Sequence, residues 1–455
     1  MRKKNQMKIM IRIIAVFIAL MTAAFIPVNL NKQEFPLYKV VIDPGHGGIS
    51  KQPMSIHGDR YDSISKKYLD NFRDGAAVYN LKEHEIVYSI AAKVEKILKL
   101  CGEDGDFYKF TEILKKYTDE QPQRIIISYM LSRGPSLKEK DADSMEDPNA
   151  EFRVFDYPDK QGNMKPGRLS KINSFKPQLV VSLHLAGFAS PDFIAMNPVI
   201  LPPNSFLQNG LLLLRKKISD SFFFGSPYQD WFDESNKRSS FQWFLNDVSL
   251  YYNSYPLHKN LKTDTANFKG YRHNMVSWKY KDEDGWEKFA ESHPTFTRYS
   301  ELYEDITPTG KFWDREKSIY EDYRRSGGYE GFGGDNAYAS YELIRYMLYA
   351  MNLKGYSSIS HVPGKPYISI WVVPHHINAV SSFIELGYLN RPQDRYMLLN
   401  KQNELAEGIA VGIYSMLTGM KLKDNKFKHK PKGLKIDFDK YKMPNNKTYF
   451  EDAVE

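Results

Sequence analysis

The stretch VVIDPGHGGIS, residues 40–50, decides how the first half of the chain is expected to fold. Three apolar residues with strand character lead into Asp43 and Pro44, and His46 follows between glycines. Because Asp-Pro-Gly is ordinary turn chemistry, a buried strand should end here. The histidine in this turn is either incidental or part of a site, and only partners elsewhere in the chain can decide between the two.

Similar strand-like runs recur along the chain. They are short, rich in β-branched residues and almost continuously apolar, as expected for strands covered on both faces. The runs cover residues 37–45, 123–133, 177–187, 367–374 and 381–389.

Helical periodicity follows the first and the last of these runs. Within residues 83–103 the apolar side chains fall on one helical face, and Gly102 is expected to end the helix. A second helical pattern runs from Asp394 to Met420. The alternation of strands and helices predicts an α/β fold, with a central twisted sheet, mostly parallel or mixed, flanked by helices.

Two segments do not follow this alternation. Residues 187–333 are aromatic, polar and rich in turn residues, which predicts a large insertion with its own packed structure before the last strand of the sheet. Residues 421–455 predict a basic C-terminal tail without a core of its own. The remaining residues, 37–186 and 334–420, are expected to form one discontinuous domain.

The N-terminal residues 1–30 combine a basic head with an apolar run at residues 13–28. This pattern is typical of a signal peptide or of an N-terminal membrane anchor, and the length of the run favours a signal peptide. Either interpretation predicts that the chain is exported to the periplasm or cell envelope, free or anchored in the inner membrane.

Composition narrows the classes of partner. A hydrophobic content of 42% with 14% aromatic residues argues against global disorder, and the net charge of +8 suits an anionic partner. Nucleic acid is not predicted as that partner, because no compact Lys/Arg cluster with interleaved aromatics occurs outside the termini. Cys101 is the only cysteine, which excludes an intramolecular disulfide and a cysteine-based zinc site.

Four polar residues stand where predicted strands end or a predicted helix begins: His46, Glu83, His184 and Glu385. Ligands of α/β sheets gather at the carboxyl ends of the strands, so these side chains can converge. Two histidines and a carboxylate suit a catalytic zinc site, with a second carboxylate as general base. From residue types alone a structural interpretation stays open, because a helix dipole favours Glu83 and a core strand can hold His184. Glu385 favours function, since an unpaired buried charge is costly.

Four segments in order resemble the zinc-dependent N-acetylmuramoyl-L-alanine amidases of the Amidase 3 type. The first is Asp-Pro-Gly-His-Gly-Gly, residues 43–48, and the second is DGAAVYNLKEHEIVYSIA, residues 74–91, in which Glu83 holds the ligand position. The third is GRLSKINSFKPQLVVSLH, residues 167–184, and the fourth is ELGYLNRPQD, residues 385–394. The resemblance covers the discontinuous domain and leaves the insertion and the tail unexplained.

The resemblance implies a hydrolase that cuts the amide bond between N-acetylmuramic acid and L-alanine in peptidoglycan, for cell-wall remodelling, division or turnover. It implies one Zn²⁺ held by His46, Glu83 and His184, with Glu385 as the catalytic acid and base. Arg168 and Asn173 are expected to be structural or to support the ligands. Besides peptidoglycan, an activator protein acting on the insertion is an expected partner. Three roles stay open for the insertion itself: a lid over the site, a surface that binds glycan, or a purely structural unit.

Some residues depart from the family pattern. SLHLAG, residues 182–187, lacks the asparagine that often follows this histidine, and LSRG, residues 131–134, stands where Thr-Arg is common. No ligand or base is lost, so substrate fit rather than activity is in question. Two alternatives stay open: a zinc peptidase that cuts within the stem peptide, and a catalytically weak or inactive peptidoglycan-binding or scaffold protein. The glycines around His46 are expected to open the backbone to metal and substrate.

Overall fold

The computed structural model of the protein describes residues 35–50, 58–62, 67–136, 147–188, 196–200, 332–356 and 379–438, with a few single or paired positions between them (145, 363–364, 367–368 and 377). The predicted leader, most of the predicted insertion and the end of the tail lie outside the described residues. The described residues from Leu37 onward belong to one compact unit.

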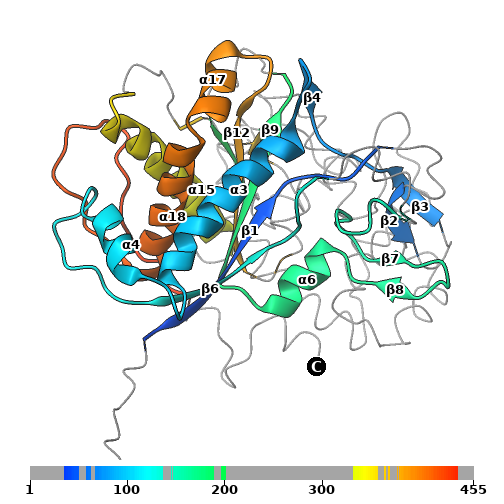
Figure 1. Ribbon diagram of the computed structural model, residues 1–455, viewed down its shortest axis with the longest axis horizontal. Coiled ribbons are helices and arrows are strands. Elements are labelled where there is room, and N and C mark those ends of the chain that lie inside the picture. Colours follow the sequence, from blue (N-terminus) through cyan, green and yellow to red (C-terminus); the bar gives the residue numbers. More distant parts are fainter. Residues whose placement is uncertain are drawn as a thin grey trace, which may run out of the picture. The chain divides into compact units, whose positions relative to one another are not determined.

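A six-stranded mixed sheet forms the centre of this unit, with strand order β11-β10-β12-β9-β1-β6 (Figure 1). Four strands run parallel to one another, β10 is antiparallel to β12, and β11 is parallel to β10. The strands are β1 (Leu37–Pro44), β6 (Ile126–Leu131), β9 (Leu179–Ala186), β10 (Asn197–Ile200), β11 (Tyr367–Ile368) and β12 (Val380–Tyr388). The predicted fold class is confirmed: it is α/β with a mixed, mostly parallel sheet.

The alternation of side chains along β1 shows why these runs are apolar throughout. Val40 and Ile42 belong to one buried cluster, whereas Val41 belongs to a second cluster on the opposite face. In β9 the same alternation places Val181 in the first cluster and Val180 in the second. Both faces are therefore covered, as expected for parallel strands.

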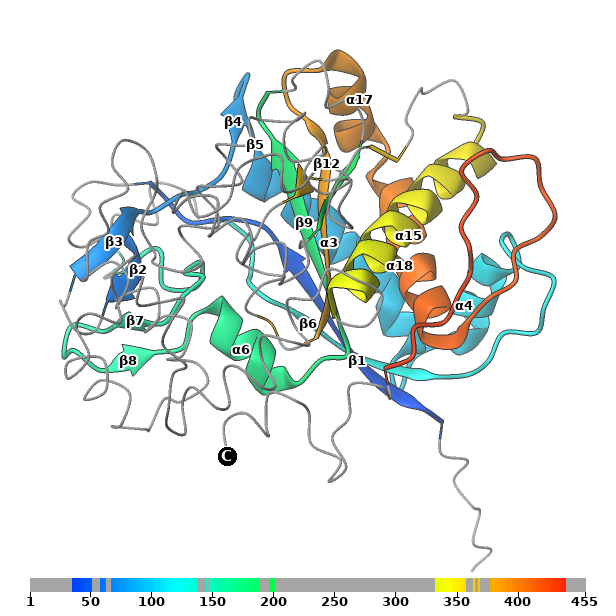
Figure 2. The same ribbon diagram turned by 180° about the vertical axis from the view of Figure 1, so that it is seen from behind.

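The helices cover the two faces unequally, as Figures 1 and 2 show from opposite sides. On the face of the first cluster lie α3 (Glu83–Leu98), α4 (Phe107–Leu114), α15 (Phe332–Leu353) and α18 (Gln402–Thr418). The other face carries α6 (Arg168–Phe175), whose Leu169 and Ile172 join the second cluster. None of the described helices is both long and apolar enough to cross a membrane.

Two predicted helices differ in detail from the structure. The first runs as α3 and then tightens into a short 3-10 turn, Lys99–Cys101, before Gly102. The second is divided into α17 (Pro392–Asn400) and α18, because the backbone of Lys401 leaves the helical conformation with φ −121° and ψ 24°.

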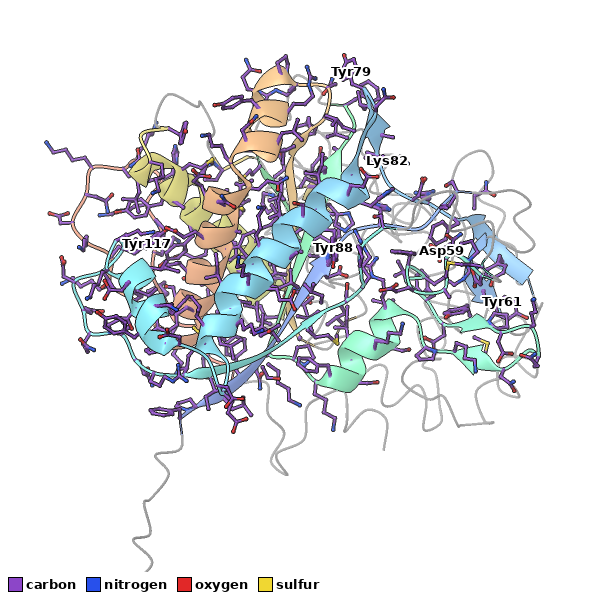
Figure 3. The ribbon with its side chains drawn as sticks, in the orientation of Figure 1. Asp59, Tyr61, Tyr79, Lys82, Tyr88 and Tyr117 are labelled. Carbon is purple, nitrogen blue, oxygen red and sulfur yellow. The ribbon has the colours of Figure 1, made fainter. Side chains whose placement is uncertain are left out.

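Three two-stranded hairpins complete the described elements. They pair β2 (Gly58–Asp62) with β3 (Lys67–Asn71), β4 (Ala77–Val78) with β5 (Leu81–Lys82), and β7 (Tyr157–Pro158) with β8 (Met164–Lys165). The hairpin β4–β5 has Tyr79 at its tip and Lys82 where the chain enters α3 (Figure 3). It therefore leads directly into one of the predicted metal ligands, Glu83.

Parts of the predicted insertion and of the predicted tail belong to the main fold. Asn197–Ile200, which the sequence placed in the insertion, form β10 of the main sheet. In the tail, Ile436 is buried in the large core cluster, and its amide donates to the carbonyl of Met416 at 2.9 Å. The tail thus packs on the core up to residue 438, where the described part ends.

Candidate metal centre

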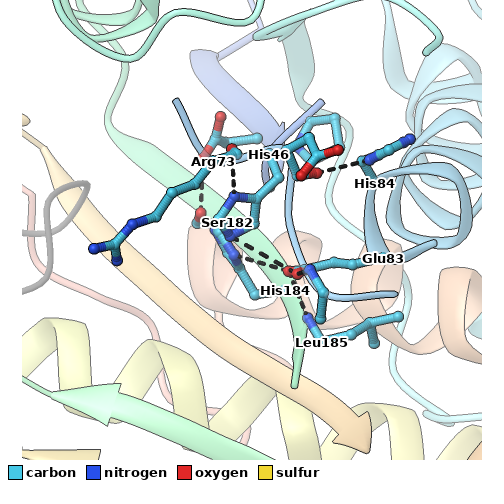
Figure 4. A network of polar contacts seen from close by, with 12 residues as sticks. His46, Arg73, Glu83, His84, Ser182, His184 and Leu185 are labelled. Carbon is cyan, nitrogen blue, oxygen red and sulfur yellow. Dashed lines mark hydrogen bonds and ion pairs between the residues drawn. The ribbon is translucent and has the colours of Figure 1, made fainter. Parts of the chain in front are cut away.

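Three of the predicted site residues come together at the carboxyl ends of the central strands. His46 follows β1, Glu83 begins α3, and His184 lies near the end of β9. One ligand atom from each of these residues lies within 4.8 Å of the corresponding atoms of the other two. Figure 4 shows the two imidazole rings and the Glu83 carboxylate facing one another. The predicted metal ligands are therefore neighbours in space.

His46 is held with its Nε2 atom toward Glu83. Its Nδ1 lies 3.2 Å from the carbonyl oxygen of Arg73, which only accepts hydrogen bonds, so Nδ1 carries the proton. Nε2 then remains free and lies 3.8 Å from Glu83 Oε2. The backbone of His46 is in the left-handed region, with φ +56°, an uncommon conformation that often marks functional sites.

Glu83 is buried and accepts hydrogen bonds on both carboxylate oxygens. The amide of Ala76 donates to Oε2 at 2.8 Å and the amide of Leu185 donates to Oε1 at 2.9 Å. Burial alone would raise the pKa of Glu83, but the facing histidines and the Ala76 amide outweigh it and lower the pKa to about 2. Glu83 is therefore a carboxylate at neutral pH, the form that binds a metal ion.

His184 is fixed between a glycine and an aromatic ring. Its ring stacks on Phe383 at 4.2 Å between centroids, and a Cβ at Gly45 would lie only 2.3 Å from its Cε1 atom. Its Nδ1 lies 3.1 Å from Glu83 Oε1, and its Nε2 is buried without a hydrogen-bond partner in the described part of the chain. A buried ring nitrogen without a partner is unfavourable unless it has another function.

These residues fit a zinc ion. Two imidazoles and one carboxylate are a known donor set of catalytic zinc, and they leave a fourth position for water or substrate. Withdrawal from water lowers the pKa of His46, although the charge of Glu83 opposes this, so its ring is neutral and able to ligate. The hydrogen bond from His46 to Arg73 is the outer-shell contact that metal-binding histidines usually make.

Glu385 lies beside this cluster on β12, directly opposite His184 in the register of the sheet. Its side chain is 5% exposed, and its Oε2 is buried with no hydrogen-bond partner among the described residues. Burial and then the charge of Glu83 raise its pKa well above the ordinary value. The group thus differs sharply from Glu83: one carboxylate is charged, and the other is ready to carry a proton.

Arg168, one of the two supporting residues suggested by the sequence, anchors the loop that carries His46. Its guanidinium forms a buried ion pair with Asp43 and also donates to the carbonyl of Pro44 at 3.2 Å. Asn173 is buried on the same helix, α6, five residues further along. Arg168 therefore holds the His46 loop in place through Asp43 and the Pro44 carbonyl.

Arg133 supports the same loop, although the sequence indicated it only as a departure from the family pattern. Its Nε donates to the carbonyl of Pro44 at 2.8 Å, and its Nη2 donates to the carbonyls of Gly45 and His84, each at 2.9 Å. Only its place just after β6 could have indicated this role. A contact made to backbone carbonyls has no partner side chain that sequence reasoning could recognise.

The glycines around His46 leave room for neighbouring protein side chains. Gly45 leaves room for the His184 ring, and a Cβ at Gly47 would lie 2.2 Å from the ring of Phe152. At Gly48 a Cβ would lie 2.5 Å from Asn149 Oδ1. These glycines therefore let protein side chains pack closely around the loop.

No family model matches the sequence, and no curated protein matches it. Three of the solved structures that resemble the chain are amidases. The CwlD amidase from Clostridioides difficile in complex with the GerS lipoprotein has 11% identity and a TM-score of 0.31, covering 83% of this chain and 96% of that chain. The N-acetylmuramoyl-L-alanine amidase AmiC2 of Nostoc punctiforme has 12% identity and a TM-score of 0.30, covering 83% of this chain and 94% of that chain. The N-acetylmuramyl-L-alanine amidase Ami1 from Mycobacterium smegmatis has 11% identity and a TM-score of 0.32, covering 83% and 94%.

Proposed function

We propose that the protein is a zinc-dependent N-acetylmuramoyl-L-alanine amidase, which hydrolyses the amide bond between N-acetylmuramic acid and L-alanine in peptidoglycan. The observation that carries this proposal is the meeting of His46, Glu83 and His184, whose ligand atoms lie within 4.8 Å of one another, beside the buried carboxyl of Glu385. A ligand set with a neighbouring proton carrier is the arrangement that metal-assisted hydrolysis requires.

The choice of bond comes from the sequence motifs. The site geometry would serve hydrolysis of many amides or esters, because it fixes a metal and a base but not a substrate. The four segments that resemble the amidase family contain all three ligands and the base in the family order. The peptidoglycan substrate is therefore the part of the proposal that most needs an experiment.

A zinc ion bound by these three residues would supply Lewis-acid chemistry, lowering the pKa of a neighbouring water towards about 7 and stabilising negative charge on a carbonyl oxygen. The protein's own groups do the rest. Glu83 and His46 are held in their ligating forms by the amide of Ala76 and the carbonyl of Arg73. No energy is then needed to reorient them during the reaction.

Glu385 would move the proton. Its Oε2 takes a proton from the attacking water and returns it to the amide nitrogen that leaves, so one residue acts first as base and then as acid. The raised pKa of Glu385 suits this exchange near neutral pH, because a carboxyl with an ordinary pKa would release protons but seldom hold one.

Export and a protein partner belong to the same proposal. The N-terminal pattern at residues 13–28 would carry the chain to the periplasm or cell envelope, where peptidoglycan lies. An activator acting on the insertion remains part of the proposal, and one similar solved structure is an amidase in complex with a lipoprotein.

The test is digestion of purified peptidoglycan by the protein lacking residues 1–30, with and without a chelator, followed by mass analysis of the released fragments. We expect stem peptides that begin at an N-terminal alanine, together with glycan free of peptide. A chelator should abolish the release, and added zinc should restore it.

Other outcomes would change the proposal in different ways. Fragments cut inside the stem peptide would keep the metal site and replace the amidase by a peptidase. Absence of any fragment, together with binding of the protein to the wall, would support a binding or scaffold protein instead.

A further inference from the structure

The residues Phe72–Ala76, here called the strap, run beside the metal centre. Hydrogen bonds to the backbone groups of the strap hold it there. Ser50 donates from its hydroxyl to the carbonyl of Phe72 at 2.9 Å. His46 Nδ1 donates to the next carbonyl, that of Arg73, at 3.2 Å. One of the metal ligands is thus bound directly to the strap.

His84 holds the following carbonyl. Its Nδ1 lies 2.7 Å from the carbonyl oxygen of Asp74, so Nδ1 carries the proton and donates it (Figure 4). At the end of the strap, Glu83 binds Ala76 twice: the Glu83 amide donates to the Ala76 carbonyl, and Glu83 Oε2 accepts from the Ala76 amide, each at 2.8 Å. Two consecutive residues of α3, one of them a metal ligand, therefore hold the strap.

Gly75 is the reason why the strap needs the hydrogen bonds from both His84 and Glu83. Its φ is +107°, and a Cβ there would lie 3.0 Å from both Glu83 Oε2 and His46 Cβ, so the strap passes in contact with two ligands. Glycine has the freest backbone of all residues. The peptide plane before Gly75 contains the Asp74 carbonyl held by His84, and the plane after it contains the Ala76 amide held by Glu83. Without His84, the peptide plane before Gly75 would lose the hydrogen bond to its carbonyl, and only the plane after Gly75 would keep one, from Glu83.

His84 is also fixed from its other side. Its side chain is 5% exposed, and its carbonyl accepts a hydrogen bond from Arg133 Nη2 at 2.9 Å. The same Nη2 atom donates to the carbonyl of Gly45, next to His46. His84 therefore connects the strap, the start of α3 and the His46 loop through fixed contacts.

We propose that His84 is a positioning residue of the metal centre: by holding the Asp74 carbonyl it fixes the strap, and through the strap it orients Glu83 and His46 for metal binding. The inference rests on the metal site of the proposed function, and not on which bond the enzyme cuts. Removing a hydrogen-bond partner that orients metal ligands typically weakens metal affinity about 10- to 100-fold.

The experiment measures zinc affinity of the full chain, first stripped of metal, by competition with a chromophoric chelator. His84→Asn keeps an amide nitrogen two bonds from Cβ, where the Nδ1 of histidine lies, whereas His84→Gln moves that nitrogen one bond further out. We expect His84→Gln and His84→Ala to weaken zinc binding about 10- to 100-fold. His84→Asn should stay within about threefold of the wild-type protein, because the hydrogen bond to Asp74 is kept.

Glu85→Gln is the matched control, because Glu85 follows His84 in the same helical turn and is exposed. It should leave zinc affinity unchanged. The denaturation midpoint of each metal-free variant is measured alongside, since a purely structural role would lower the midpoint without separating Asn from Gln in zinc affinity. If His84→Ala does not fold, the Asn and Gln variants still decide the question.

Equal zinc affinity of the Asn and Gln variants would overturn the inference while leaving the metal site intact. Failure of the wild-type protein to bind zinc would overturn the inference and the proposed function together. Normal zinc affinity in all variants, with peptide fragments from a different bond, would reject the positioning role and the choice of bond separately.

Discussion

Glu385 and Glu83 lie close together, but their surroundings shift their pKa values in opposite directions. Glu83 accepts two backbone amides and remains ionised, whereas Glu385 has an oxygen without a partner in the described residues and a raised pKa. Since the pKa of Glu83 is lowered and that of Glu385 is raised, Glu83 is suited to holding a cation and Glu385 to moving a proton. The proposed roles of the two residues rest on this contrast.

Replacing Glu385 by glutamine should separate these roles. We expect Glu385→Gln to bind zinc with nearly the wild-type affinity and to lose about 100- to 10,000-fold in turnover, because glutamine fills the space but carries no transferable proton. Turnover on purified peptidoglycan and zinc content per chain are the two measurements. Wild-type turnover in this variant would refute the assignment of Glu385.

The buried carboxyl of Asp43 allows a second test, through the stability of the folded protein in acid. Burial would raise its pKa, but the charge of Arg168 and hydrogen bonds from Ser132 and Ser182 outweigh it and lower the pKa to about 2. A carboxyl with a depressed pKa stabilises the fold above its unfolded pKa, and this contribution is lost as the pH falls from about 4 to about 2. The shift corresponds to about 2 kcal/mol.

The measurement is the free energy of unfolding by urea of the metal-free protein and of Asp43→Asn. At pH 6 the variant should be less stable by about 3–5 kcal/mol, because Arg168 loses its buried partner. This deficit should shrink by about 2 kcal/mol as the pH approaches 2. The difference between the two proteins removes the contribution of Glu83, which titrates in the same range. A deficit that does not depend on pH would show that Asp43 is not ionised in the folded protein.

Sequence reasoning reached the residues whose side chains meet at the candidate metal centre. His46 follows a strand, His184 and Glu385 lie near the ends of theirs, and Glu83 begins a helix, and these are positions that a sheet brings together. Arg133 and His84 could not be found in this way. They act by holding backbone carbonyls, and a carbonyl is present at every residue, so nothing in the sequence marks the one that is bound.

At the scale of elements, the residues after α18 behave as a part of the fold. Met420 and Gly433 are joined by a hydrogen bond from amide to carbonyl of 2.9 Å, and Glu342 of α15 accepts from the Gly433 amide at 2.7 Å. Tyr338 of α15 donates to the carbonyl of Leu434 at 2.9 Å. Composition could not predict this packing, because the segment reads as basic and punctuated by turn residues.

Two neighbouring tail residues provide a matched test. Ile436 is 2% exposed and Leu434 is 58% exposed. We expect Ile436→Ala to lower the free energy of unfolding by about 2–5 kcal/mol, because it removes buried methyl groups and leaves a cavity. Leu434→Ala should change it by less than about 0.5 kcal/mol. Urea unfolding measures both, and equal effects would contradict the packing of the tail.

The positions of the helices were predicted from the sequence, but the break that divides the last helical pattern was not. Apolar spacing located the helical pattern from Asp394 to Met420, yet the break at Lys401 depends on its own surroundings. The ammonium of Lys401 is hydrogen-bonded to the hydroxyl of Tyr356, which follows α15. A tertiary contact of this kind overrides local periodicity, and it cannot be read from either segment alone.

At the level of the whole molecule, we expect zinc binding not to require the long segment between β10 and α15. The three proposed ligands and Glu385 lie outside residues 201–331, which the structure does not describe. We expect a variant in which a flexible linker of roughly a dozen residues replaces 201–331 to fold and to bind zinc with an affinity close to that of the full chain. Zinc competition and circular dichroism test this.

The activity of that variant on peptidoglycan tests the role of the segment. Raised activity would support a lid over the site, and lowered wall binding would support a glycan-binding surface. Unchanged activity and binding would leave the segment a structural role only. Loss of zinc binding in a folded variant would contradict the independence of the metal centre.

The position of β12 between β9 and β10 has a consequence for synthesis. The last ligand, His184, leaves the ribosome about 200 residues before Glu385, which corresponds to about 10–40 s at ordinary rates of translation. A growing chain therefore contains the three proposed ligands long before it contains the proposed base. Since β12 must still enter between strands already made, the proposed site cannot be complete before the chain has been synthesised and folded as far as β12.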